Sequence, residues 1–256
     1  MTQKFDIGKF PIVWFDLDDT LWDMTGNSCI ALEKLYDTDP TVRRAFAARG
    51  LRDWMDVYHR INRVLWRQYD AGTIDRATLR RERFALPLQE AGLGRDEACE
   101  AAVRLDRDYL RYLGDCPALV PGARQAVDAL LAAGVRMGIV SNGFREVQYR
   151  KLASGGLDGI FSPIVLSDDT GINKPARGFF DFAVRAAGVA PQECLLVGDN
   201  ARSDIAGALD AGWGAALWLD NGSDSVEPDL AGRLLADPRC VRFTDMAQVP
   251  ALLGLG

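Results

Sequence analysis

The sequence predicts an α/β fold: a doubly wound, mostly parallel, Rossmann-like sheet with a helical cap inserted after its first strand. Beyond residue 121, short apolar segments alternate with helix-like segments, which is typical of parallel sheets built from right-handed crossovers. Between residues 23 and 115, apolar residues instead recur at helical spacing without a convincing buried strand. We therefore expect a core of residues 1–22 and 116–256 and a helical cap of residues 23–115.

The first strand is predicted at Pro11-Ile12-Val13-Trp14, a short apolar run of the kind that is buried on both faces of a sheet. Phe15-Asp16-Leu17-Asp18-Asp19-Thr20-Leu21 follows directly. Clustered carboxylates at the end of a buried strand repel one another and lose hydration, so they call for a bound cation, raised pKa values, or both. An acidic turn that caps a helix through Asp19 or Thr20 explains the same residues without a site.

The cap segment is predicted to contain four or five helices separated at glycines. An aromatic and aliphatic stripe on the helix near residue 60 is expected to form the core of the cap. An offset face of that helix carries Asn62, Trp66 and Tyr69, an amide and two aromatic rings that could line a site. Arg83 is a further candidate residue of such a site. The alternative is that Trp66 and Tyr69 only pack inside the cap.

After a hinge at residues 116–122, the core continues with strands and helices in alternation. The expected strands are 135–140, 164–166, 194–197, 215–219 and, more weakly, 241–243. The expected helices are one that ends at Gly134, then 144–153, 179–187, 201–211 and one near 246–253.

Three polar motifs follow three of these strands: Ser141-Asn142-Gly143, Lys174-Pro175, and a segment from Gly198-Asp199 to Asp204. Each motif alone could be a turn, a solvated lysine or a helix cap. Their order is more informative, because open α/β sheets bind ligands at the carboxyl ends of their strands. An acid, a hydroxyl, a lysine and a second acid are therefore expected to face one site.

The amino-acid composition limits the classes of binding partner and the cellular compartment that we expect. The 256 residues are 48% hydrophobic and carry a net charge of −6, which favours neither a nucleic acid polymer nor a membrane as partner. Five scattered cysteines without a CxxC pair are typical of a reducing compartment. Neither a signal peptide nor a membrane-spanning apolar stretch is apparent, so we expect a cytoplasmic protein.

Together these motifs resemble those of the haloacid dehalogenase (HAD) superfamily, in its phosphatase branch. The DxDx(T/V) motif is similar to residues 16–20, the strand-closing Ser/Thr to Ser141, the lysine to Lys174, and GDxxxxD to residues 198–204. Within the superfamily, the cap resembles that of the YjjG-like pyrimidine 5′-nucleotidases. That finer likeness rests on Ile61-Asn62, Leu65-Trp66, Tyr69, Gly72, Ile74 and Arg83-Phe84, together with Asp220 in the core.

The resemblance implies a Mg²⁺-dependent phosphomonoester hydrolase that acts through an aspartyl phosphate. Asp16 would be the nucleophile, Asp18 the general acid and base, and Lys174 the counter-charge. The phosphate-binding residues would be Thr20, Ser141, Asn142 and Lys174. The metal residues would be Asp16, Asp18 (through its backbone carbonyl), Asp199 and Asp204, the last orienting a metal-bound water or Lys174.

The resemblance also implies the substrate, a nucleoside 5′-monophosphate with pyrimidine and deoxy forms preferred. The amide of Asn62 and the rings of Trp66 and Tyr69 are suited to hold its base, and Arg83 is a further candidate contact to the substrate. Dehalogenases of the superfamily lack the acid at the position of Asp18, so its presence favours an ester over a halide. Three alternatives stay open: a phosphatase for sugar phosphates or phosphoglycolate, a phosphohexomutase, and a non-catalytic HAD-fold binding protein. The expected partner is a small phosphate ester, and the expected assembly is a monomer or a weak homodimer.

Overall fold

The computed structural model describes residues 5–222 and 226–255, and its chain divides into two compact units. The core unit comprises Met1–Met24 and Pro117–Gly256, and the helical unit comprises Thr25–Cys116. Each unit is described by itself below. Among the described residues, no helix combines the length and the apolar character that crossing a bilayer requires.

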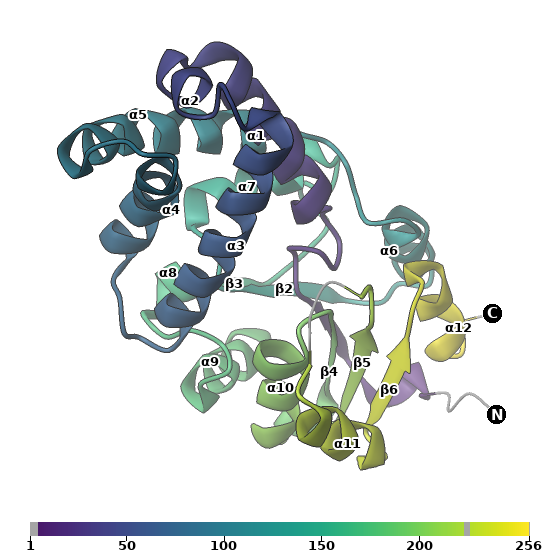
Figure 1. Ribbon diagram of the computed structural model, residues 1–256. Coiled ribbons are helices and arrows are strands. Elements are labelled where there is room, and N and C mark those ends of the chain that lie inside the picture. The colour runs from purple at the N-terminus through teal and green to yellow at the C-terminus, as the bar shows by residue number, and fades with distance from the viewer. Residues whose placement is uncertain (1–4, 223–225, 256) are drawn as a thin grey trace. The chain divides into compact units, whose positions relative to one another are not determined.

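The core unit is built on one sheet of six parallel strands in the order β3-β2-β1-β4-β5-β6 (Figure 1). This arrangement confirms the α/β, Rossmann-like fold class that the alternation predicted. The strands of the described chain are β1 (Ile12–Phe15), β2 (Met137–Ser141), β3 (Ile164–Leu166), β4 (Cys194–Gly198), β5 (Ala215–Leu219) and β6 (Cys240–Phe243).

β1 lies at the centre of the sheet because every side chain in it is apolar and buried. It pairs with β2 on one side and with β4 on the other. Ile12 and Trp14 join an apolar cluster with Phe179 and Phe180 on one face. Side chains alternate along a strand, so Phe15 points to the other face, where its ring packs edge-on against Phe161.

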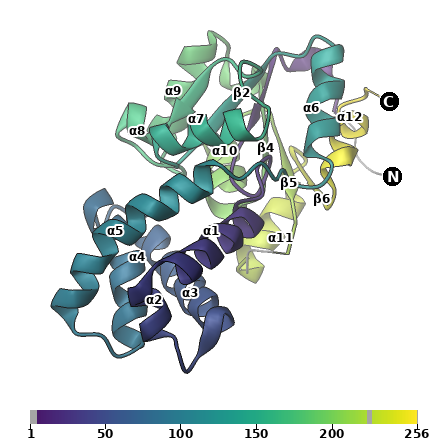
Figure 2. The same cartoon turned by 90° about the horizontal axis from the view of Figure 1, so that it is seen from above.

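Helices cover the sheet as two layers in the core unit. α9 and α10 supply the apolar cluster on one face, and α6 and α12 lie side by side elsewhere in the unit (Figure 1 and Figure 2). The α-helices are α6 (Ala123–Ala132), α7 (Arg145–Ser154), α8 (Ser167–Thr170), α9 (Arg177–Ala187), α10 (Gly207–Asp210), α11 (Pro228–Ala236) and α12 (Val249–Leu252). Shorter turns are η1 (Ile7–Lys9), η2 (Pro191–Glu193), η3 (Ala201–Ala206) and η4 (Met246–Gln248).

Two expected helices of the core differ from the structure. The segment 201–211 begins as a π-helical turn, η3, and becomes α-helical only in α10. The wider turn brings the Ile205 amide to the Asn200 carbonyl at 3.2 Å. The segment 246–253 is likewise divided, into η4 and α12.

The helical unit consists, over its described residues, of five helices whose shared core is aromatic. Trp54, Tyr58, Phe84 and Tyr109 pack ring against ring within it, and all four are fully buried. Asp39 directly precedes α2, and its carboxylate caps the amides of the first turn. The helices are α1 (Met24–Thr38), α2 (Pro40–Ala45), α3 (Gly50–Asp70), α4 (Arg76–Glu90) and α5 (Arg95–Gly114).

Candidate active site

The candidate site lies at the carboxyl edge of the core sheet, where Asp16 follows β1 directly. The Asp16 amide donates to the Val197 carbonyl at 3.0 Å, which continues the ladder between β1 and β4 by one step. The Asp16 side chain is only 9% exposed. Burial raises the pKa of Asp16 to about 7 against the opposing effect of the Lys174 cation, and the neighbouring Asp204 and Asp18 raise it further. A counter-charge is therefore needed to keep this carboxylate ionised.

A tight turn after Asp16 carries Asp18 and Thr20. Asp19 occupies the left-handed region with φ of 57°, which an aspartate tolerates better than most residues. Its amide donates to the Trp22 carbonyl at 2.8 Å and thereby closes the turn. The buried Thr20 hydroxyl donates to Asp199 Oδ1 at 3.3 Å. The side chain of Thr20, predicted to bind phosphate, thus orients a carboxylate of the acidic cluster.

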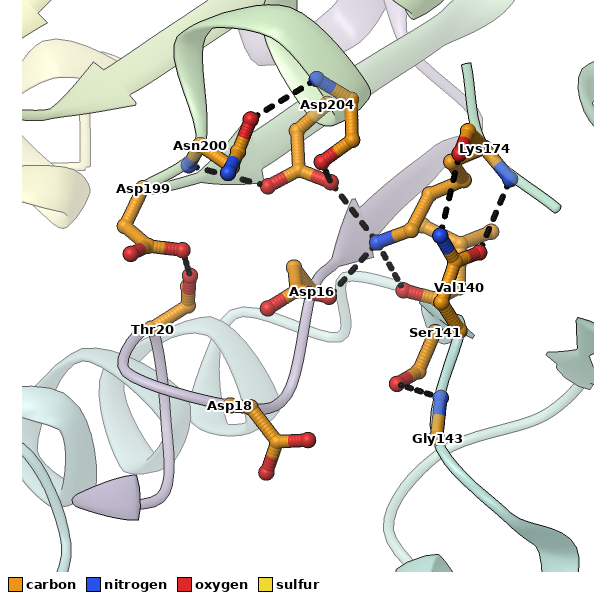
Figure 3. A network of polar contacts seen from close by, with 12 residues as sticks. Asp16, Asp18, Thr20, Val140, Ser141, Gly143, Lys174, Asp199, Asn200 and Asp204 are labelled. Atoms are coloured by element: carbon orange, nitrogen blue, oxygen red, sulfur yellow. Dashed lines mark hydrogen bonds and ion pairs between the residues drawn. The ribbon is translucent and has the colours of Figure 1, made fainter. Parts of the chain in front are cut away.

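Lys174 supplies the counter-charge at the centre of the site (Figure 3). Its ammonium donates to Asp16 Oδ1 at 2.6 Å, to Asp204 Oδ1 at 2.7 Å and to the Val140 carbonyl at 3.0 Å. Burial disfavours the charge of a side chain that is 3% exposed, but Asp16 and Asp204 outweigh this effect and raise the pKa of Lys174 above its usual range. Lys174 is therefore a permanent cation between two carboxylates.

Asn142 holds the backbone of Lys174 in place. Its Nδ2 donates to the Lys174 carbonyl at 3.0 Å, and its Oδ1 accepts from the Lys174 amide at 2.8 Å. The Asn142 side chain, predicted to bind phosphate, therefore connects the end of β2 to the loop that presents the lysine. The neighbouring Ser141 hydroxyl accepts from the Gly143 amide at 3.1 Å and keeps its own proton to donate.

The segment after β4 shapes the position of Asp204. Asn200 caps η3 by accepting from the amides of Arg202 and Ser203 at 3.0 and 2.8 Å, and its own amide donates to Asp204 Oδ2 at 3.1 Å. Gly198 packs against Asp204 so closely that a Cβ there would lie 2.8 Å from the Asp204 Cβ. The glycine of the GDxxxxD pattern is thus required by close approach, and both Asp204 oxygens accept hydrogen bonds from the protein.

Asp16, Asp199 and Asp204 form an acidic cluster in which one carboxylate oxygen of each lies within 4.8 Å of the others. Burial and the charges of Asp16 and Asp204 raise the pKa of Asp199 well above its usual range. Lys174 alone cannot balance three carboxylates, of which Asp16 and Asp204 are buried and Asp199 is half-buried, and an all-oxygen donor set is the kind that Mg²⁺ prefers. The residues therefore fit a divalent cation. The Asp18 side chain is outside this cluster, which leaves its backbone carbonyl as the ligand that the sequence predicts.

Two residues at the site were not predicted from the sequence. Lys151 Nζ lies 2.6 Å from Asp18 Oδ1, and Gln148 Nε2 donates to Asp18 Oδ2 at 3.0 Å. Both come from α7 and are three residues apart, so they share one helix face. The sequence feature that could have indicated them is a glutamine and a lysine on the buried side of the helix that follows the Ser-Asn-Gly motif.

The remaining candidates belong to the helical unit and are described within it. Asn62, Trp66 and Tyr69 are partly buried on α3, and the Trp66 and Tyr69 rings meet edge to face at 5.6 Å. Arg83 is 3% exposed and forms an ion pair with Asp106 inside the unit. The observed partner of Arg83 is thus another residue of the helical unit, and its contact with a substrate stays a prediction.

Comparison with known proteins places this site in a family. The model of the family described as haloacid dehalogenase-like hydrolase matches residues 10–212, which include every core motif discussed above. The chain belongs to the haloacid dehalogenase-like hydrolases. Membership confirms the resemblance that the four motifs indicated, and it makes the chain a hydrolase by family.

Relatives of this HAD-like hydrolase are named for different phosphatase activities. The pyrimidine 5′-nucleotidase YjjG of Escherichia coli is 30% identical over 83% of this chain and 87% of its own length. A phosphoserine phosphatase of Thermus thermophilus is 29% identical over 85% of this chain and 92% of its own length. The crystal structure of the putative HAD-hydrolase YfnB of Bacillus subtilis bound to magnesium shares the fold, with a TM-score of 0.79. The match covers 98% of this chain and 100% of that chain at 24% sequence identity.

Proposed function

We propose that this hydrolase removes phosphate from small phosphate monoesters, with Mg²⁺ as cofactor and Asp16 as a covalent nucleophile. The observation that carries the proposal is the buried pairing of Lys174 with Asp16 within the acidic cluster. At a buried position with only a structural role, a neutral side chain would cost less desolvation energy than an aspartate. A nucleophile, in contrast, must stay ionised and close to cationic charge.

The first step forms a bond between a carboxylate oxygen of Asp16 and phosphorus and breaks the ester bond to the leaving oxygen. An in-line displacement puts the leaving oxygen on the far side of phosphorus from the nucleophile. The Asp18 carboxyl points away from Asp16 and from Asp199 (Figure 3), as an acid that protonates this oxygen must. In the second step, Asp18 takes a proton from water as its oxygen attacks phosphorus, and phosphate leaves with Asp16 restored.

Electrostatics accounts for the other residues. Lys174 would neutralise the phosphoryl oxygens together with Asp16, and the hydroxyl of Ser141 would donate to one of them. Asp16, Asp199 and the Asp18 carbonyl would hold Mg²⁺, with Asp204 fixing the geometry through Lys174 and Asn200. The cation, when bound, supplies positive charge that favours a phosphoryl group between anionic residues.

Nucleoside 5′-monophosphates, with pyrimidine and deoxy forms preferred, are the proposed substrates. Support comes from the E. coli relative named a pyrimidine 5′-nucleotidase, and from the partly buried Asn62, Trp66 and Tyr69, whose groups suit a base. Other small phosphate esters are the second candidate class, because relatives at 29% and 27% identity are named phosphoserine phosphatase and glyceraldehyde 3-phosphate phosphatase.

A screen of phosphorylated metabolites tests both proposals by measuring released phosphate in the presence of Mg²⁺. We expect UMP or dUMP to give the highest kcat/KM, and Asp16→Asn to abolish release because an amide is not a nucleophile. A clear preference for a sugar phosphate or phosphoserine would overturn the substrate class. Full activity of Asp16→Asn would overturn the mechanism.

A further inference from the structure

Two buried polar side chains of α7 hold the carboxylate of Asp18 from one side. Lys151 Nζ is 2.6 Å from Oδ1, and Gln148 Nε2 donates to Oδ2 at 3.0 Å. Each oxygen of Asp18 thus has its own donor on the same helix. The Asp18 side chain is 30% exposed, and a partly exposed side chain can change rotamer. These two contacts therefore fix the Asp18 rotamer.

Lys151 is an expensive residue to bury for packing alone. It is only 3% exposed, and its ammonium lies 4.9 Å from the centre of the buried Trp22 ring and 3.7 Å from Met24 Sδ. An apolar side chain of similar length would fill the same space without the desolvation of a charge. The geometry therefore indicates that the lysine is kept for its contact with Asp18.

Gln148 connects Asp18 to the hydroxyl predicted to bind phosphate. Its Nε2 also donates to Ser141 Oγ, at 2.7 Å, so one amide fixes the separation of the two side chains. The turn between β2 and α7 is shaped around it, because a Cβ on Gly143 would lie 2.3 Å from the Gln148 amide carbon. Gln148 Oε1 is buried and accepts no hydrogen bond from the part of the chain that the structure describes.

We propose that Gln148 and Lys151 are positioning residues that aim Asp18 at the leaving-group oxygen, an inference that rests on the proposed function. Proton transfer requires the acid within hydrogen-bond reach of that oxygen while the phosphoryl group is held elsewhere. Gln148 supplies this link by touching both Ser141 and Asp18, and Lys151 keeps the second oxygen of Asp18 from rotating. In the described chain neither residue is hydrogen-bonded to a carboxylate of the acidic cluster: Lys151 acts through Asp18, and Gln148 acts through Asp18 and Ser141.

The test compares two substrates that differ in their need for an acid, using the full chain with Mg²⁺. p-Nitrophenyl phosphate expels a stable anion, whereas an alkyl or nucleoside phosphate needs its leaving oxygen protonated. The value of kcat/KM covers the steps up to the first irreversible one, so it isolates leaving-group departure. Lys151→Met should lower kcat/KM for the alkyl ester about 10–100-fold and for the aryl ester only a few-fold. Lys151→Arg should recover part of the loss.

A double variant separates positioning from a general structural role. Combined with Asp18→Asn, Lys151→Met should add nothing further to the alkyl-ester defect, because the residue through which it acts is already gone. Arg150→Met, which removes an exposed cation from the same helix, is the matched control and should leave both substrates unchanged. Should Lys151→Met fail to fold, Gln148→Leu provides a second variant. Loss of its contact with Ser141 should lower activity on both substrates, and loss of its contact with Asp18 should add an excess loss on the alkyl ester.

Equal losses on the two substrates, or losses that multiply in the double variant, would overturn the positioning role. The proposed function fails separately: phosphatase activity is wrong if the unsubstituted protein with Mg²⁺ releases phosphate from neither ester, and the acid–base role of Asp18 is wrong if Asp18→Asn hydrolyses the alkyl ester normally. A normal Lys151→Met beside a defective Asp18→Asn would reject the positioning role alone.

Discussion

Lys174 is the residue on which the charge balance of the site depends. Its ammonium is within 2.7 Å of both Asp16 and Asp204, and nearly all of its surface is buried. Removing one member of such a group leaves buried anions without compensation, which is more damaging than the absence of the whole group.

Lys174→Met is therefore expected to reduce the free energy of unfolding of the metal-free protein by about 3–5 kcal/mol and to remove hydrolysis. Urea denaturation measures the first effect and phosphate release the second. Lys9→Met, which removes an exposed lysine of the same unit, is the control and should change stability by less than about 0.5 kcal/mol. Similar stability of the two variants would show that the ion pairs of Lys174 are not as described.

Residue types and order predicted much of the site, while the direction of individual side chains was not available from them. Asp16, Lys174, Asp199 and Asp204 come together because parallel strands bring their carboxyl ends to one edge. The side chains of Thr20 and Asn142, which the sequence predicts to bind phosphate, bond to Asp199 and to the Lys174 backbone in the structure, and their contact with phosphate stays a prediction. A local pattern does not say which neighbour a short polar side chain will reach across the fold.

At the scale of elements, the strands were predictable from apolar runs, and the turns beside them were not. β5 has the bounds that the sequence predicts, and β3 does as well. The π-helical start of η3 was missed because Ala201 to Ala211 has an ordinary helical pattern, while the widened turn depends on capping by Asn200. Local hydrogen bonds of one polar side chain, which the apolar periodicity does not report, accompany the widened turn there.

Gly198→Ala tests whether close approach of β4 and η3 sets the position of Asp204. The added methyl would lie 2.8 Å from the Asp204 Cβ and carboxylate, so Asp204 must move and its contact with Lys174 must loosen. We expect kcat to fall about tenfold or more, as for other small misplacements of catalytic groups. Steady-state kinetics at saturating substrate and Mg²⁺ measure the change.

Gly232→Ala is the matched control for that substitution. Gly232 lies in α11, and a Cβ there would meet nothing within 4 Å. Replacing a helical glycine by alanine should leave kcat unchanged and stabilise the protein by up to about 1 kcal/mol. Unchanged kcat in Gly198→Ala would show that Asp204 tolerates displacement and that its position does not limit turnover.

For the whole molecule, the acidic cluster links stability, pH and metal binding. The pKa of Asp16 rises from 3.8 to about 7 on folding, so between these values the folded state holds a proton that the unfolded state has lost. The metal-free protein should therefore lose stability as pH rises through this window. Mg²⁺ needs the ionised carboxylates, so protons compete with it on the acidic side.

Millimolar Mg²⁺ is thus expected to raise the thermal midpoint more at about pH 8 than at about pH 6. Asp199→Asn, which removes one carboxylate of the cluster, should lose most of that increase at both pH values. Thermal unfolding followed by circular dichroism gives the midpoints. An increase that is independent of pH and retained in Asp199→Asn would place the Mg²⁺ site away from this cluster.

Covalent capture of phosphate by Asp16 is the central claim, and chemical trapping tests it most directly. An acyl phosphate is reduced by borohydride to an alcohol, whereas a free carboxylate is not, so a quenched reaction records which aspartate carried the phosphate. Peptide mapping of the Asp18→Asn variant, mixed with substrate and Mg²⁺ and quenched with borohydride, should find homoserine at position 16. Homoserine at another position, or an unmodified residue 16 while the variant still turns over, would contradict the mechanism.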